Sequence, residues 1–170
     1  MALQSILLLL VVLVIGTVQG NLSPLQEDMQ ILSGVGWDGY VVYNVSPEYK
    51  GSMYYISRDP EPFNLAKMNM RCKGYGGYLV QIDNYREYRY LRFQAVRRRS
   101  RTLVYTGITD LGSEGRFYNF NDKKPAGYLR WRRRQPDNWK GNEHCVHITI
   151  WGLNDIGCDG IGRYICEIPV

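Results

Sequence analysis

The sequence predicts one α+β domain over residues 51–170. Two stretches with apolar residues at helical spacing lie in its first half, and short strand-like runs end the chain. Between them runs a long segment rich in Gly, Asn, Asp and Pro, and loops of that length are usually functional or disordered. Function is therefore expected in this segment.

The first half of the domain alternates predicted strands and helices. Met53–Ser57 is rich in aromatic and β-branched residues and predicts a strand. Residues 62–72 predict a helix with Pro62 in its first turn. Its apolar stripe consists of Phe63, Ala66 with Leu65, Met70 and Cys72. A glycine-rich break at residues 73–77 ends this helix, and Tyr78–Ile82 predicts the next strand.

A second helix is predicted from a cap at Asp83 or Asn84 to about Arg98. One stripe of this helix is interpreted as core rather than as a ligand platform, and it consists of Tyr85, Tyr88, Leu91 and Ala95. Three further strands are predicted at Leu103–Gly107, Val146–Trp151 and Arg163–Ile168.

Residues 1–20 predict a secretory signal peptide, because an apolar run from Ile6 to Ile15 precedes a small-residue exit. The run lacks a preceding Lys or Arg, so an uncleaved anchor is the alternative, although the run is short for crossing a bilayer. Residues 21–50 are expected to form an N-terminal extension, and no second hydrophobic stretch follows. The mature protein is therefore expected to be secreted, extracellular and without a membrane span.

Four cysteines lie in the mature part: Cys72, Cys145, Cys158 and Cys166. An even number in a chain sent to an oxidising compartment predicts two disulfides, and the sequence allows three pairings. In the loop-entropy model, closing about 15 residues contributes roughly 3 kcal/mol and closing about 100 residues roughly 4.7 kcal/mol. A nested pairing, with Cys145–Cys158 inside Cys72–Cys166, would close one short loop and one long loop and gain both contributions.

The formal net charge is +5, and arginines gather in two clusters. The first consists of Arg97, Arg98, Arg99 and Arg101, and the second of Arg130, Arg132, Arg133 and Arg134. Each of the two clusters can be explained as a basic face exposed to solvent. The second cluster directly precedes Gln135, so it would also attract anionic ligands bound there. Without a nucleic-acid-binding motif in a secreted chain, acidic or sulfated glycans fit better than nucleic acid.

Five oxygen-bearing side chains fall in a short window: Gln135, Asp137, Glu143, Asn154 and Asp155. A donor set made only of oxygens, with three carboxylates, suits Ca²⁺, which takes six to eight oxygen ligands. Zinc prefers His or Cys ligands, which are mostly absent from this set. Taken alone, Gln135–Asn138 would be an ordinary surface turn.

Together these residues resemble a C-type lectin-like domain, in particular the galactose-type members that carry Gln-Pro-Asp. The resemblance covers about Gly51 to Glu167. The residues that carry it are Cys72, Tyr78–Ile82, Thr106, Gly107, Asp110, Glu114, Trp131, Gln135–Asp137, Glu143, Cys145, Asn154, Asp155, Cys158 and Tyr164–Glu167. It implies two helices, two small antiparallel sheets and a long calcium-binding loop region.

The resemblance also implies a site and a function. It pairs Cys72 with Cys166 and Cys145 with Cys158, and it places Pro136 in the cis form. The five oxygen ligands become the principal calcium site. The sugar is held by Gln135, Asp137, Trp139, Glu143 and Asn154. The implied function is galactose-type, calcium-dependent recognition of glycans, including microbial surface glycans, in innate immunity.

Some residues depart from the family pattern. Only Lys140–Asn142 separates Trp139 from Glu143, where galactose-type members carry a glycine-rich loop. His144 replaces a usual ligand of an auxiliary calcium site, for which three other residues remain. They are Asp110, Glu114 and Asn138. Trp139 itself is either a sugar-packing residue or a residue that belongs to the core or pins the loop.

Two other classes of function are considered. An enzyme is not expected, because His144 and His147 should face opposite sides of a strand and the carboxylates are explained by calcium. The alternative is a lectin-like fold that binds protein or anionic glycan without calcium through its arginine clusters. The sequence contains no coiled coil, collagen repeat or spare cysteine that would indicate how the protein assembles, so its oligomeric state is not predicted.

Overall fold

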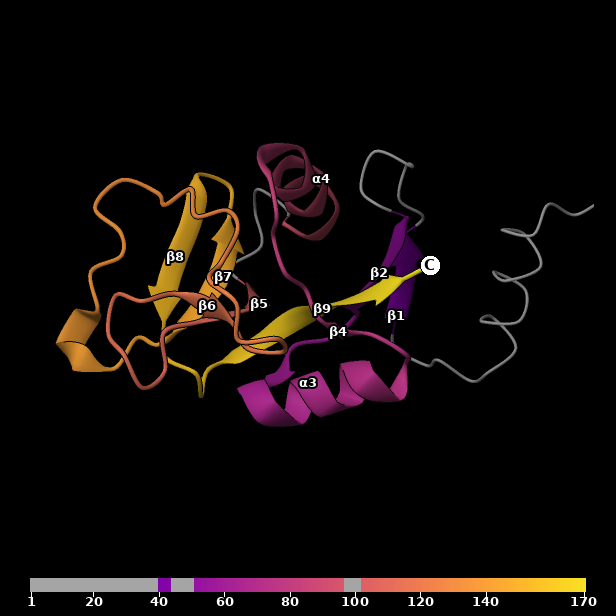
Figure 1. The fold of residues 1–170 in the computed structure, drawn as a ribbon, viewed down its shortest axis with the longest axis horizontal. Helices are drawn as coiled ribbons and strands as arrows, with labels where there is room; N and C mark the ends of the chain where they lie inside the picture. The colour runs from indigo at the N-terminus through magenta and orange to yellow at the C-terminus, as the bar shows by residue number, and fades with distance from the viewer. Residues whose placement is uncertain (1–39, 44–50, 97–101) are drawn as a thin grey trace, which may run out of the picture. The chain divides into compact units, whose positions relative to one another are not determined.

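The computed structural model describes residues 40–43, 51–96 and 102–170 (Figure 1). The expected signal peptide, most of the expected N-terminal extension and the first arginine cluster lie outside the described residues. In the described part no helix is both long and apolar enough to cross a bilayer.

The strands follow one path of hydrogen-bonded neighbours in the order β1, β2, β9, β5, β7, β8. Their bounds are β1 Tyr40–Tyr43, β2 Ser52–Ser57, β9 Ile161–Pro169, β5 Leu103–Thr109, β7 Cys145–Thr149 and β8 Gly152–Ile156. Three two-residue strands join from the side: β3 Glu61–Pro62 and β4 Tyr78–Leu79 pair with β9, and β6 Tyr118–Asn119 pairs with β5. A short 3-10 helix, η2, spans Trp139–Gly141.

The sheet is mixed, which corrects the expectation of antiparallel sheets. β9 pairs antiparallel with β2 and parallel with β5, where Leu103 lies opposite Gly162 and Tyr105 opposite Tyr164. The long strand β9 therefore belongs to both halves and holds them together. The residues paired in these parallel strands are fifty or more positions apart in the sequence. Local sequence patterns therefore do not predict the parallel pairing.

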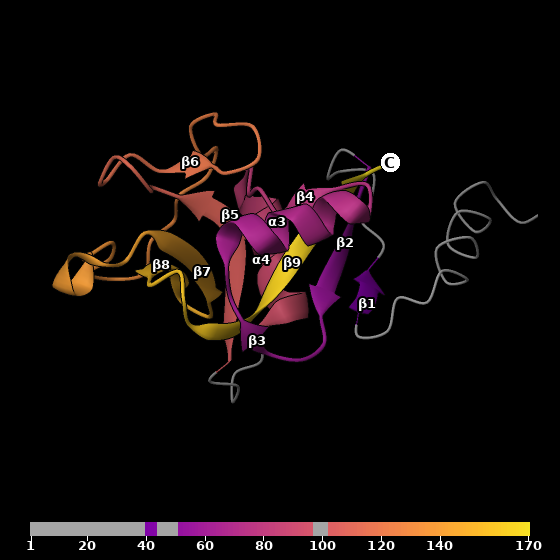
Figure 2. The ribbon, with the colours of Figure 1, turned by 90° about the horizontal axis from the view of Figure 1, so that it is seen from below.

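Two helices lie on opposite sides of β9, as both views show (Figures 1 and 2). Helix α4 spans Tyr85–Ala95, and the Asn84 side chain caps it by accepting hydrogen bonds from the N–H groups of Arg86 and Glu87. Tyr88, Leu91 and Ala95 are buried as predicted, whereas Tyr85 is exposed.

Helix α3 spans Leu65–Gly74 and begins later than predicted. Asn64 is its N-cap, because its side chain accepts the N–H of Lys67. Pro62 belongs to β3 instead of the first helical turn. The shift also moves the buried face, so the expectation for Ala66 and Met70 is wrong and both are exposed. The buried residues of α3 are Leu65, Met68, Asn69 and Cys72.

Strand β8 was not predicted, because Asn154 and Asp155 resemble loop residues in the sequence. β8 pairs with β7 along its length, and the turn between the two strands includes Trp151, which lies outside the strand predicted to contain it. The polar residues of β8 are nevertheless buried, and this burial is the first sign of a site at its end.

The main core fills the space between α4 and the sheet. It consists of Tyr54, Ile56, Val80, Ile82, Tyr88, Leu91, Ala95, Val104, Ile108, Phe117, Val146, Ile148, Leu153 and Ile165. Two disulfides lock the ends of the domain to its middle: Cys72–Cys166 joins α3 to β9, and Cys145–Cys158 joins the start of β7 to the segment after β8. The nested pairing is therefore confirmed.

Candidate functional site

Three carboxylates converge where the loop after Trp131 meets β8. Asp137, Glu143 and Asp155 each place an oxygen within 4.8 Å of the others, and we call them the loop carboxylates. Asp155 is 1% exposed and comes from β8, while the other two come from the loop. Within the described chain no Lys, Arg or His side chain forms an ion pair with any of the three.

Backbone N–H groups fix the position of Asp155 against the loop. One oxygen accepts the N–H of Asp137 at 3.2 Å, and the other accepts the N–H of Asn138 at 2.7 Å. The peptide bond between Gln135 and Pro136 is cis, as the family resemblance implies. The loop therefore turns back so that its own carboxylate lies beside that of the strand.

Glu143 is held by the short 3-10 turn that precedes it. Its carboxylate accepts the N–H of Trp139 at 2.9 Å, and its own N–H donates to Asn138 Oδ1 at 3.1 Å. Burial raises the pKa of Glu143, and the neighbouring carboxylates Asp155 and Asp137 raise it further. The three acids repel one another, so a cation between them would relieve a real electrostatic cost.

Two amide oxygens flank the loop carboxylates on the same two segments. Gln135 Oε1 and Asn154 Oδ1 are buried and have no hydrogen-bond partner, although the Asn154 amide nitrogen donates to the Asp155 carbonyl. A buried acceptor left unpaired costs about 1–3 kcal/mol, so two of them on the segments that carry the three acids require an explanation. A hard cation would supply it, and the oxygens of these five residues are of the kind that fits calcium.

The loop is attached to β8 through main-chain atoms. Leu153 donates its N–H to the Arg130 carbonyl at 2.7 Å, and its carbonyl accepts the N–H of Arg132 at 2.9 Å. Gly152 is required next to this contact, because a Cβ there would lie 2.5 Å from the Arg132 nitrogen and its φ is +147°. The Trp131 ring packs against Phe117 with centroids 4.7 Å apart.

Trp139 lies beside the loop carboxylates and is 61% exposed, so it is not a core residue. The Lys140 ammonium lies 4.1 Å from the centre of its ring. An open cavity of about 360 Å³ adjoins it, lined by Leu103, Tyr105, Trp139, Lys140, Asn142, Glu143, Ile156, Gly157, Asp159 and Gly160. The cavity could not be predicted from the sequence, because its walls come from three separate segments of the chain: β5, the loop and the end of β8.

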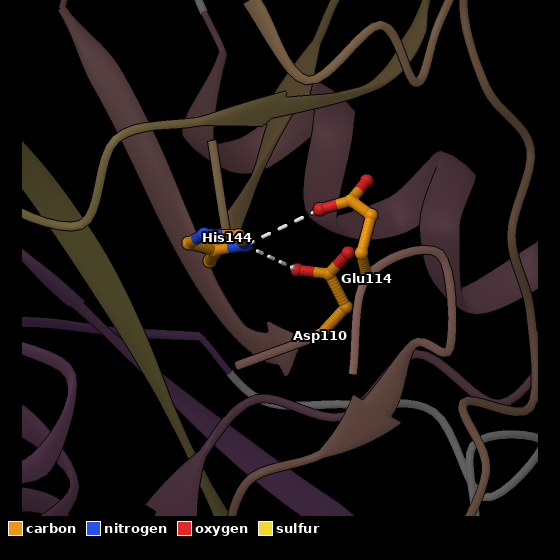
Figure 3. Close-up of side chains that lie close together, drawn as sticks. All are labelled: Asp110, Glu114 and His144. Atoms are coloured by element: carbon orange, nitrogen blue, oxygen red, sulfur yellow. Dashed lines mark hydrogen bonds and ion pairs between the residues drawn. The ribbon is translucent and has the colours of Figure 1, made fainter. Parts of the chain in front are cut away.

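A second group of metal-ligating side chains forms on the other side of β7. Asp110, Glu114 and His144 place one ligand atom each within 4.8 Å of the others, and we call them the histidine cluster (Figure 3). His144 Nδ1 lies 3.1 Å from Asp110 Oδ1 and 3.5 Å from Glu114 Oε2. The fold thus brings together Asp110 and Glu114, expected as auxiliary calcium ligands, and adds the histidine.

Asn138, the third expected auxiliary ligand, takes part in the principal loop. Its N–H donates to Asp155 and its side-chain oxygen accepts from Glu143, so it supports the loop carboxylates. Its backbone is left-handed, with φ at 39°, a conformation that Asn tolerates better than most residues.

His147 lies on β7, three residues beyond His144. Burial lowers its pKa to about 4, and nearby Arg132 contributes in the same direction. The imidazole is therefore neutral at physiological pH. His147 does not belong to the histidine cluster, as expected for residues on opposite faces of a strand.

The chain belongs to the C-type lectin family, because the Lectin C-type domain matches residues 61–168. It is similar to Salivary C-type lectin 1 of Aedes albopictus, with 29% identity over 107 residues that cover 56% of this chain and 70% of that protein. It is also similar to C-type lectin 37Da of Drosophila melanogaster, with 28% identity over 162 residues that cover 80% of this chain and 85% of the relative.

Solved structures agree with this assignment. The mouse scavenger receptor C-type lectin carbohydrate-recognition domain superposes with a TM-score of 0.64 at 28% identity, covering 75% of this chain and 93% of that domain. The chain thus carries a carbohydrate-recognition domain of a non-enzymatic family, as expected from its sequence. The α+β fold with two helices and two disulfides is confirmed as that of this family.

Proposed function

We propose that this protein is a secreted, calcium-dependent lectin of galactose-type preference. The observation that carries the proposal is the set of three loop carboxylates with two unpaired amide oxygens beside them, those of Gln135 and Asn154. Calcium bound there supplies a positive centre that accepts two neighbouring sugar hydroxyls as ligands.

The protein side chains orient the sugar around that centre. Carboxylates such as Asp137 and Glu143 accept hydrogen bonds from the sugar hydroxyls, whereas the amide N–H groups of Gln135 and Asn154 donate hydrogen bonds. The order of amide and carboxylate around Pro136 decides which hydroxyl pair fits, and Gln-Pro-Asp favours the 3- and 4-hydroxyls of galactose. Exposed Trp139 offers an apolar face for the sugar ring. The adjoining cavity leaves room for the rest of the glycan.

A glycan array probed with and without EDTA tests this proposal. EDTA should abolish binding, and free galactose should compete better than mannose. Asp137→Ala should behave like EDTA, whereas Asp59→Ala, which changes an exposed carboxylate far along the chain, should bind like the natural protein. Full binding in EDTA contradicts calcium dependence, and better competition by mannose contradicts the galactose preference.

Secretion and a role in innate defence are part of the proposal. The signal peptide over residues 1–20 supports secretion, and the name of the Aedes albopictus relative places that protein in saliva. A single shallow site binds a monosaccharide weakly, so clustered microbial glycans are the ligands we expect to be bound with useful avidity. Secretion of the full chain from insect cells, with sequencing of the released N-terminus, tests the cleavage near Gly20.

A second candidate function is calcium-independent binding of anionic glycans. It rests on Arg130, Arg132, Arg133 and Arg134, which are all exposed next to the loop and pair with no carboxylate of the described residues. Binding of this kind should weaken steeply with salt and ignore EDTA. The same array read at two salt concentrations separates it from the calcium site.

A further inference from the structure

We propose that the histidine cluster, Asp110, Glu114 and His144, is a zinc site separate from the principal calcium site. Nothing in the sugar-binding proposal requires it, and the two proposals stand or fall independently. The cluster combines one imidazole nitrogen with two carboxylates, which are typical zinc ligands.

The spacing of the three ligand atoms fits a tetrahedral ion. Zinc bonds of about 2.0–2.1 Å place neighbouring ligand atoms roughly 3.3–3.4 Å apart at tetrahedral angles. The imidazole Nδ1 lies 3.1 Å from one carboxylate oxygen and 3.5 Å from the other. Figure 3 shows both carboxylates directed at the same ring nitrogen, Nδ1. The imidazole nitrogen and the two carboxylates thus supply three ligands at nearly tetrahedral spacing, and the fourth position is left for water.

The chemistry of the donors distinguishes this cluster from the principal site. Calcium needs six to eight oxygens, and the histidine cluster offers only two carboxylates with a nitrogen. Imidazole suits zinc and neighbouring transition metals, whereas an all-oxygen set suits calcium. His144 thus changes which metal the position prefers instead of only removing a calcium ligand.

The surrounding structure holds two of the ligands in place. Asp110 is fully buried, and its second oxygen accepts the N–H of Gly115 at 2.8 Å. The carbonyl of His144 accepts hydrogen bonds from the Asp110 N–H and the Thr109 hydroxyl. Supporting contacts of this kind orient metal ligands and strengthen binding. Only Glu114, whose side chain is about half exposed, has freedom to close onto an ion.

Zinc at this position would tie the loop after β5 to the start of β7. Asp110 and Glu114 lie on the loop, and His144 directly follows the loop carboxylate Glu143. The two metal positions therefore share one short stretch of backbone but no ligand side chain.

Calorimetric titration of zinc into the full-length, metal-free protein tests the proposal. One zinc ion per chain should bind in Asp137→Ala, a variant in which the principal site is disabled. Adding His144→Ala to that variant should weaken zinc binding by about 100-fold or more, since even supporting contacts contribute 10- to 100-fold. An unchanged circular dichroism spectrum of His144→Ala shows that this variant is folded. Unchanged zinc affinity in the His144 variant overturns the proposal.

A matched exchange and a spectroscopic measurement sharpen the test. His144→Asp restores an all-oxygen set, so zinc should bind at least about tenfold more weakly and a second calcium ion should be bound. Cobalt, used as a visible probe on the unmodified protein, should give the intense absorption of a tetrahedral ion and be displaced by one equivalent of zinc. A weak octahedral spectrum, or zinc affinity retained in His144→Asp, argues against the site.

Discussion

Carboxylates lie in two regions of this domain, and the regions treat them differently. In the scaffold, Glu167 on β9 accepts hydrogen bonds from Ser52 Oγ at 3.0 Å and from the Gln81 N–H at 3.3 Å. Burial raises its pKa to about 7, and the charge of Glu87 adds to the effect. The loop carboxylates instead face one another beside two unpaired amide oxygens. Glu167 is satisfied by hydrogen bonds within the scaffold, whereas the loop carboxylates accept backbone N–H groups and still face one another with no cationic side chain of the described residues paired to them.

The largest effect is expected when one of the loop carboxylates is removed. Asp155→Ala removes one proposed calcium ligand and the acceptor of two backbone N–H groups. Calcium affinity should fall by about 100-fold or more, and sugar binding should be lost with it. Calcium titration followed by calorimetry measures this, with Asp59→Ala as the control. Calcium affinity within a few-fold of the unmodified protein would remove Asp155 from the ligand set.

Glu167 in the scaffold should make the stability of the protein depend on pH. The pKa of Glu167 is raised from 4.5 in the unfolded chain to about 7, so the folded state binds more protons between these values. Its contribution is therefore fully present below pH 4.5 and is lost as pH rises through 7, by about 3 kcal/mol at 1.36 kcal/mol per pKa unit.

Urea unfolding at pH 5 and pH 7.5, with EDTA present, measures this difference in the free energy of unfolding. Glu167→Gln stays neutral and should show a smaller loss of stability between the two pH values. Glu61→Gln, which changes a partly exposed carboxylate paired with Arg71, should keep the loss. An equal loss in all three proteins would mean that Glu167 is not the group responsible.

A smaller effect is expected when the amide and the carboxylate on either side of Pro136 are exchanged and the net charge of the loop is kept. Gln135→Glu with Asp137→Asn leaves one carboxylate and one amide around Pro136, so calcium affinity should change little. The preference should move from galactose toward mannose by about tenfold, or 1.4 kcal/mol. Competition by the two free sugars against an immobilised glycan measures the ratio. An unchanged ranking means that these side chains do not read the hydroxyls directly.

The smallest effect is expected at Trp139. Packing of a sugar against its exposed ring is worth about 0.5–1.5 kcal/mol, so Trp139→Ala should weaken galactose binding roughly two- to tenfold. Calcium affinity should be retained. Trp151→Ala is the matched control, because that ring is 75% exposed at the turn between β7 and β8. Equal losses in both variants would show that Trp139 has no special role.

The parts of the fold that depend on local patterns were predicted from the sequence. Asn84 was one of two predicted caps for the second helix, and Tyr88, Leu91 and Ala95 occupy the predicted stripe. The nested disulfides and the cis bond before Pro136 followed from the family resemblance. These features are encoded by neighbouring residues or by a motif.

The parts that depend on distant contacts were not predicted. The strand β8 was missed because Asn154 and Asp155 are polar residues, and their burial in the strand does not follow a hydrophobic pattern. The parallel pairing of β5 with β9 joins segments about sixty residues apart. His144 was expected to remove a ligand, and only the fold shows it 3.1 Å from Asp110, thirty-four residues away.

The attachment of the loop to Leu153 has a consequence for the evolution of this surface. The contact uses the carbonyl of Arg130 and the N–H of Arg132, so it places no demand on the side chains at these positions. Substitutions of Arg130, Arg132 and Arg133 can accumulate while the backbone keeps its course, whereas Trp131 packs against Phe117, Arg134 has a left-handed backbone and Gly152 is sterically constrained. New recognition surfaces can therefore arise beside the site by ordinary mutation, without any change to the framework that supports it.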